Sequence, residues 1–111
     1  RNVLREIMEK SPTIRYLQEY LKSKDYKGST PDPYFYKLVE EVGELSRAIF
    51  REVPPATEEN FKGSIEEELW DIMYYTLCIA NEYGIDMDKW IRIKEDFNNK
   101  RYNPDAKYDP K

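Results

Sequence analysis

Two stretches rich in proline, glycine and polar residues divide this chain into segments. None of these segments alternates apolar and polar residues as a strand does. The sequence KGSTPDP (27–33) interrupts the chain once, and VPPATEENFKG (53–63) interrupts it again. The paired prolines of the second stretch exclude a continuous helix there, because proline has no N–H to donate and clashes with the preceding turn. Without a strand pattern, the chain is restricted to helices of moderate length.

Capping residues predict where these helices begin and end. Ser11 and Pro12 predict a short helix before them and a longer one from about Pro12 to Ser23. Asp32 with Pro33 predicts the cap of a helix that reaches about Glu52. A capping box of Ser64 and Glu67 opens a helix to Tyr83 that stops at Gly84, and Asp86 caps a last helix from Met87 to Tyr102, ended by Asn103 and Pro104.

The expected fold is therefore all-α: a four-helix bundle-like domain with a short extra N-terminal helix. A chain of 111 residues is most simply one domain. We expect a single domain over residues 1–111, with a core at about 12–102 and a loose tail at 103–111.

Composition excludes several kinds of chemistry. The chain has no histidine, which removes Ser-His-Asp catalysis, most zinc sites and the Glu-x-x-His pairs of di-iron bundles. Its one cysteine, Cys78, lies between Leu77 and Ile79 and is predicted to be a small apolar core residue. A net charge of −4 argues against nucleic acid as a partner, and the absence of an apolar run argues against a membrane span. We expect a cytoplasmic protein.

Two of the three glutamates in the segment KLVEEVGELSRAIF (37–50) fall on or beside the face predicted to line the core. At about 100° per residue, Glu41 falls within the apolar arc of its helix, Glu44 falls at the edge of that arc, and Glu40 projects outside it. The arc comprises Phe35, Leu38, Val42, Leu45, Ala48 and Ile49.

The helix after the second break repeats this pattern. Glu68 lies beside Ile72 and Ile79, and Asp71 lies at the edge of the apolar arc near Tyr75, whereas Glu66 and Glu67 project elsewhere. The arc comprises Ile65, Leu69, Ile72, Thr76, Ile79 and Tyr83. Each of the two helices thus presents an acidic pair at i, i+3 spacing on its inward face.

Inward acids require a counter-charge, because an isolated buried carboxylate is costly. A solvated charged face would lie opposite the apolar arc, and Arg47 or Arg51 would have to pair with these acids from outside the arc. A bound cation fits better, and an all-oxygen ligand set favours Mg²⁺, with Mn²⁺ as the alternative.

The last helix begins with an apolar stripe that turns basic and polar. Met87, Trp90 and Ile91 start the stripe, which continues through Lys94, Asn98 and Arg101. Such a change indicates that the last turns border a cleft for anions. The alternative is the ordinary preference of cations for the negative end of a helix dipole.

These residues together resemble the MazG-like all-α nucleoside triphosphate pyrophosphohydrolases. That family has the motif Glu-x-x-Glu, a spacer and Glu-x-x-Asp, which stands here as Glu41-Val-Gly-Glu44 and Glu68-Leu-Trp-Asp71. The family also often ends its last helix with the pattern found in KEDFNNKRYNP (94–104). The likeness extends from about Tyr34 to Tyr102.

The resemblance implies a Mg²⁺-dependent enzyme that cleaves a nucleoside triphosphate to the monophosphate and pyrophosphate, as in nucleotide-pool cleansing. It implies that four acids are metal ligands, with Glu41 or Glu44 the general base. It implies five substrate-binding residues: Lys94, Asn98, Arg101, Tyr75 and Tyr102. Rival interpretations are a non-catalytic nucleotide- or metal-binding module, a structural helical bundle, and a phosphoribosyl-ATP pyrophosphohydrolase, whose usual sequence stretches are missing here.

A second apolar strip on the helix that carries Glu68 indicates a further packing partner. Trp70, Met73 and Leu77 lie away from the inner arc, and a helix that is apolar nearly all round must be covered on both sides. The N-terminal helices or a second subunit would supply that cover. The family likeness favours a homodimer or homotetramer.

Overall fold

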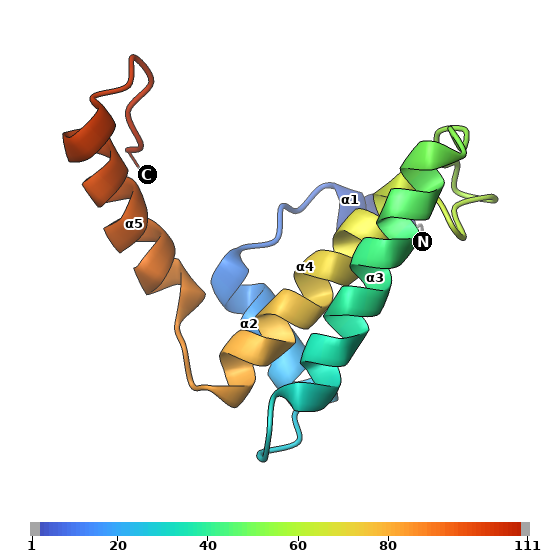
Figure 1. The fold of residues 1–111 in the computed structure, drawn as a ribbon, viewed down its shortest axis with the longest axis horizontal. Helices are drawn as coiled ribbons and strands as arrows, with labels where there is room; N and C mark the ends of the chain where they lie inside the picture. The colour runs from blue at the N-terminus through green and yellow to red at the C-terminus, as the bar shows by residue number, and fades with distance from the viewer. Residues whose placement is uncertain (1–2, 110–111) are drawn as a thin grey trace.

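The computed structural model describes residues 3–109, and within them every regular element is a helix (Figure 1). The helices are α1 (Val3–Met8), α2 (Ile14–Lys24), α3 (Asp32–Phe50), α4 (Ile65–Glu82) and α5 (Met87–Tyr102). The predicted all-α class is confirmed. None of the helices in this part of the chain is both long and apolar enough to cross a membrane.

The ends of α4 and α5 follow the sequence prediction. Ser64 Oγ accepts a hydrogen bond from the Glu67 N–H at 3.1 Å, and Gly84 takes the left-handed conformation just beyond α4, with φ at +67°. Asp86 Oδ1 accepts from the Lys89 N–H at 3.3 Å, and Asn103 ends α5 with φ at +44°. Local capping chemistry is therefore sufficient to set these boundaries.

The starts of α2 and α3 differ from the prediction. α2 is capped by Thr13, whose hydroxyl accepts from the Tyr16 N–H at 3.0 Å, and does not begin at Pro12. α3 begins at Asp32 because Pro31, the N-cap residue, already has helical backbone angles. Pro31 offers no side-chain hydrogen bond, and Thr30 Oγ1 accepts from the Asp32 N–H at 3.3 Å. Proline fits several of the first helical positions, since their N–H groups have no intrahelical partner, and so it marks a start only approximately.

The core lies where α2 crosses the antiparallel pair formed by α3 and α4. α3 and α4 run side by side (Figure 1), and α2 packs against the C-terminal half of α4. The buried centre comprises Leu21, Tyr34, Leu77 and Cys78. Burial raises the pKa of the Cys78 thiol to about 12, so this thiol is a packing group, as predicted.

Only part of the predicted apolar arc of α3 is covered. The buried face runs through Tyr34, Leu38, Glu41, Leu45 and Ala48, whereas Phe35, Val42 and Ile49 remain at least half exposed. The prediction that these three line the interior is wrong for the single chain. An apolar sector this wide can present either of its edges to a neighbour, and α4 contacts one edge only.

Three residues predicted to line the apolar arc on and just after α4 are also exposed, because α3 covers only one edge of that arc. They are Leu69, Thr76 and Tyr83. Of the second strip on α4, Leu77 is buried beneath α2, while Trp70 and Met73 remain partly exposed. Helical periodicity places the exposed apolar residues of α3 and α4 on one side of the antiparallel pair. We call this surface the open apolar face, comprising Phe35, Val39, Val42, Ile49, Leu69 and Met73.

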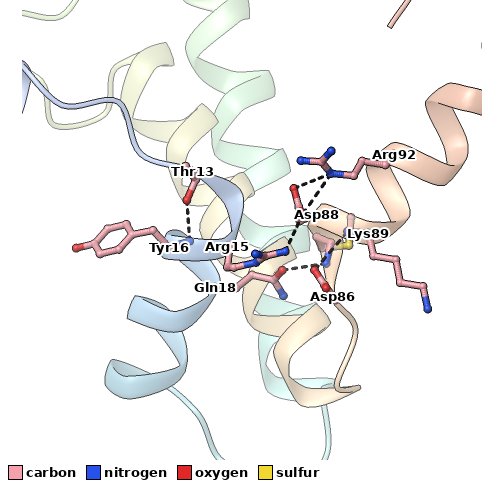
Figure 2. A network of polar contacts seen from close by, with 9 residues as sticks. Thr13, Arg15, Tyr16, Gln18, Asp86, Asp88, Lys89 and Arg92 are labelled. Carbon is pink, nitrogen blue, oxygen red and sulfur yellow. Dashed lines mark hydrogen bonds and ion pairs between the residues drawn. The ribbon is translucent and has the colours of Figure 1, made fainter. Parts of the chain in front are cut away.

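α5 leaves the other helices as an arm that is held at its first turn (Figure 1). Gln18 makes the joint: its amide N–H donates to Asn81 Oδ1 at 3.0 Å and to the Ile85 carbonyl at 2.9 Å. Gln18 Oε1 accepts from the Met87 N–H at 2.9 Å. Figure 2 shows the outer part of this joint, where Asp88 contacts Arg15 and Arg92.

Candidate metal centre

Three of the four predicted ligands meet between α3 and α4. Glu41, Glu68 and Asp71 each offer a carboxylate oxygen within 4.8 Å of the others. α3 supplies the first from the middle of its buried face, and α4 supplies the other two from adjacent turns. Carboxylate groups at this spacing are able to share one divalent cation.

The deepest member of this acid cluster is Glu68, which is 6% exposed. Its Oε2 is buried and has no hydrogen-bond partner among the described residues. The neighbouring Glu41 carboxyl, which can share a hydrogen with Glu68, followed by burial and the charges of nearby acids, raises the pKa of the Glu68 carboxyl to about 7. Both observations indicate that this position needs a proton or a cation.

Asp71 lies closer to solvent and is affected by the same charges. Burial, followed by the charges of Glu41 and Glu67, raises the pKa of Asp71, and the positive charge of Lys62 opposes that increase. Two like charges about 4 Å apart repel by roughly 4 kcal/mol at an effective dielectric constant of 20. A divalent cation would convert this repulsion into attraction, so the residues present fit a metal ion.

The fourth predicted ligand, Glu44, lies outside the acid cluster. Its side chain is exposed and pairs with Arg47 at 3.7 Å in an i, i+3 contact along α3. Glu44 follows Glu41 by one turn on the same side of the helix. It therefore borders the cluster without belonging to it.

Lys62 is a cation near the acids that the sequence analysis missed. Its Nζ lies 2.8 Å from Glu67 Oε2, and it also interacts with Asp71 and Glu68. The loop that carries Lys62 is attached to the first turn of α4, because Glu66 accepts from the Ala56 N–H and Glu67 accepts from the Gly63 N–H. Only tertiary structure could have identified Lys62, since the loop has no periodicity.

Tyr75, a predicted substrate-binding residue, lies on the same side of α4 as the acids. It follows Asp71 by four residues and Glu68 by seven, and it is half-buried. Burial, followed by the charge of Glu41, raises the pKa of Tyr75, while Lys37 on α3 lowers it. Tyr75 and Lys37 therefore border the acid cluster.

The remaining predicted substrate residues lie on the α5 arm, which packs against α2. Lys94 Nζ lies 5.0 Å from the centre of the Phe97 ring, and the guanidinium of Arg101 lies 5.5 Å from that of Tyr102. Asn98 is half-buried, while Lys94, Arg101 and Tyr102 are exposed. The structure thus gathers these four on one arm, apart from the acid cluster.

The fold and the acid cluster together define a small all-α protein with a carboxylate site between two antiparallel helices. Residues 29–101 match the family model of the MazG nucleotide pyrophosphohydrolase domain. The matched region includes all of α3 and α4 and nearly all of α5. The chain belongs to the MazG family.

The chain is also similar to individual proteins. The uncharacterized protein YpjD of Bacillus subtilis (strain 168) is 32% identical over 83 residues, which cover 66% of this chain and 74% of YpjD. The crystal structure of Ntag-iMazG from Vibrio DAT 722 is similar with a TM-score of 0.77 and 38% identity, over 84% of this chain and 100% of that chain. A crystal structure of the Ctag form gives a TM-score of 0.73 at 38% identity, over 80% and 99% of the two chains.

Proposed function

We propose that this protein is a divalent-cation-dependent nucleoside triphosphate pyrophosphohydrolase that uses Mg²⁺ and contributes to nucleotide-pool cleansing. The reaction would cleave the bond between the α- and β-phosphates, giving a nucleoside monophosphate and pyrophosphate. The observation that carries the proposal is the buried, unpartnered Oε2 of Glu68 beside Glu41 and Asp71. Membership of the MazG family supports the reaction class.

The acids have two tasks in this proposal. Glu41, Glu68 and Asp71 hold the metal, with Glu44 completing the set from the edge. A bound divalent cation neutralises phosphate charge, polarises a phosphoryl oxygen and makes a bound water more acidic. Glu41 or Glu44 accepts the proton of the attacking water, because a general base must lie within hydrogen-bond reach of that water.

The cations and the tyrosine at the border of the acid cluster would contact the substrate. Lys62 interacts with Asp71, and Lys37, one turn before Glu41 on α3, interacts with Tyr75. Both lysines would pair with phosphates that reach a metal held by the acids. A lysine pairs with a phosphate as a point charge. Tyr75 is the aromatic residue available to the nucleotide on this side of α4.

We propose that the active form is a homodimer or homotetramer in which the α5 arm of one subunit serves the acid cluster of another. Lys94, Asn98, Arg101 and Tyr102 would then contact the nucleotide bound by the partner subunit. The support is that α5 exposes about half of Trp90, Ile93 and Phe97, while the open apolar face remains uncovered. A second copy would bury both surfaces.

The test is an assay of pyrophosphate release with a panel of ribo- and deoxyribonucleoside triphosphates in the presence of Mg²⁺. We expect release with at least one nucleotide, and none after chelation of the metal. Glu66→Gln is the matched control, since Glu66 precedes the acids on α4 and the glutamine keeps an oxygen that can accept from the Ala56 N–H of the loop. Tight nucleotide binding without release of pyrophosphate would favour a binding module.

A further inference from the structure

Asp25 connects three helices next to the proposed site. It ends α2, and its side chain accepts hydrogen bonds from tyrosines on two other helices. The Tyr34 hydroxyl on α3 lies 2.8 Å from Asp25 Oδ1 and 2.7 Å from the Asp25 carbonyl oxygen, and these two acceptors share its one hydrogen. The Tyr74 hydroxyl on α4 donates to Asp25 Oδ2 at 3.1 Å. Each carboxylate oxygen thus orients one ring.

These two rings hold a third ring between them. Tyr34 stacks on Tyr75 with a centroid distance of 6.4 Å and an interplanar angle of 30°. Tyr74 meets Tyr75 edge to face at 5.2 Å and 67°. Aromatic pairs have preferred orientations, so fixing Tyr34 and Tyr74 restricts the ring of Tyr75. Tyr75 is the only member of this trio that shares the α4 face of Glu68 and Asp71.

Burial, with added contributions from Asp25, raises the pKa of Tyr34 and of Tyr74 well above the ordinary value for tyrosine. Both hydroxyls therefore keep their hydrogens and are able to donate to Asp25. Hydrogen bonds to a charged acceptor are stronger than neutral ones, and here two of them converge on one carboxylate. Packing of two phenylalanines would fill similar space but would not fix the rings in this way.

We propose that Asp25 is a positioning residue that orients Tyr75 toward the nucleotide, acting through Tyr34 and Tyr74. This inference rests on the proposed function, because it assumes that a nucleotide binds at the acid cluster. Asp25 itself does not touch the substrate. Tyr75 is the contact residue, and the carboxylate sets the angle at which its ring is presented.

The test is a double-mutant cycle between Asp25→Asn and Tyr75→Leu, measured as KM and kcat for pyrophosphate release. Asparagine is nearly isosteric with aspartate but lacks its charge, so we expect D25N to raise KM by roughly three- to tenfold with little change in kcat. In the Y75L background, D25N should change KM no further, because the effects of two substitutions that remove the same contact do not add. The double variant Y34F/Y74F should reproduce the KM of D25N and provides a milder substitution if D25N folds poorly.

Glu82→Gln is the matched control. Glu82 lies on α4 and accepts hydrogen bonds from the Lys27 and Gly28 N–H groups, so it attaches the loop between α2 and α3 to α4. The hydroxyls of Tyr34 and Tyr74 donate to Asp25 and not to Glu82. We expect E82Q to lower the melting temperature while KM stays at the wild-type value. A purely structural role for Asp25 would instead make D25N behave like E82Q.

The same cycle is measured a second time as the Kd of the Mg²⁺ complex of α,β-methylene ATP, which needs no turnover. Additive effects of D25N and Y75L on both KM and Kd overturn the positioning role, while an active wild type leaves the proposed function standing. A wild type that binds the analogue but releases no pyrophosphate overturns the enzymatic proposal, and non-additive Kd values still support Asp25. A wild type that neither binds nor hydrolyses nucleotide overturns both.

Discussion

The α3–α4 pair and the α5 arm carry the two halves of the predicted site, and they are supported in different ways. Glu41, Glu68 and Asp71 lie on helices packed side by side, and Glu68 is almost fully buried. Lys94 and Arg101 lie on a helix that contacts the other helices near its first turn and, near its end, the C-terminal segment, through hydrogen bonds between Asn99 and Tyr108. The single chain therefore gathers the acid cluster by itself, whereas in our proposal the residues on α5 reach a nucleotide only in a partner subunit.

The largest effect that tests this comparison is expected at Glu68. Changing even a residue that supports a metal ligand typically costs about 10- to 100-fold, so Glu68→Gln should lower kcat/KM by more than about 100-fold. The helix caps are untouched, and the variant should remain folded by circular dichroism. Turnover within a few-fold of the E66Q control would show that Glu68 is not a ligand.

Subunit mixing tests whether α5 serves another chain. Glu68→Gln and Lys94→Ala damage different halves of the site, so in a mixed dimer one composite site carries both changes and the other carries neither. Random mixing makes half of the dimers mixed, and activity should recover to about a quarter of the wild-type level. Activity no greater than the mean of the two separate variants would show that Lys94 acts within its own chain or not at all.

Lys62 should have a smaller effect, because it borders the acid cluster from a loop. A charge-assisted contact is worth about 1.5–3 kcal/mol, so Lys62→Ala should raise KM by roughly tenfold or more. The control is Lys100→Ala, since Lys100 pairs with Asp96 on the outside of α5. Equal KM values for the two variants would remove Lys62 from the substrate site.

The joint of α5 should give the smallest effect. Asp88 pairs with Arg15 at 2.9 Å and with Arg92 at 3.3 Å, and both arginines are largely exposed. Exposed ion pairs contribute less than about 1 kcal/mol, so Asp88→Asn should barely change the free energy of unfolding in urea. A loss of several kcal/mol would mean that the ion pairs, rather than the Gln18 amide contacts, hold the arm.

The sequence predicts most accurately those features that residues close together in the sequence determine. Ser64 and Asp86 each cap a helix with a single side chain that accepts a hydrogen bond from a nearby N–H group. The structure confirms both caps. Helical periodicity was also enough to bring Glu41, Glu68 and Asp71 to one place, because each acid lies on the buried side of its own helix.

The sequence does not predict which residues are covered or approached by a distant part of the chain. Phe35, Val42 and Ile49 are as apolar as Leu38 and Leu45, so the pattern cannot tell which edge of the arc α4 will cover. Lys62 reaches the acids through a loop fixed by Glu66 and Glu67, which carries no periodic signal. The position of α5 depends on contacts of Gln18, far away in the sequence.

Metal binding is tested most directly by a calorimetric titration of the nucleotide-free protein with Mn²⁺ and with Mg²⁺, comparing the wild type with E68Q and E66Q. We expect saturable binding by the wild type and E66Q, loss of that binding in E68Q, and a metal-dependent rise in melting temperature that follows the same order. Equal metal binding by all three proteins, or none by the wild type, would contradict the claim that α3 and α4 gather these carboxylates around a divalent ion.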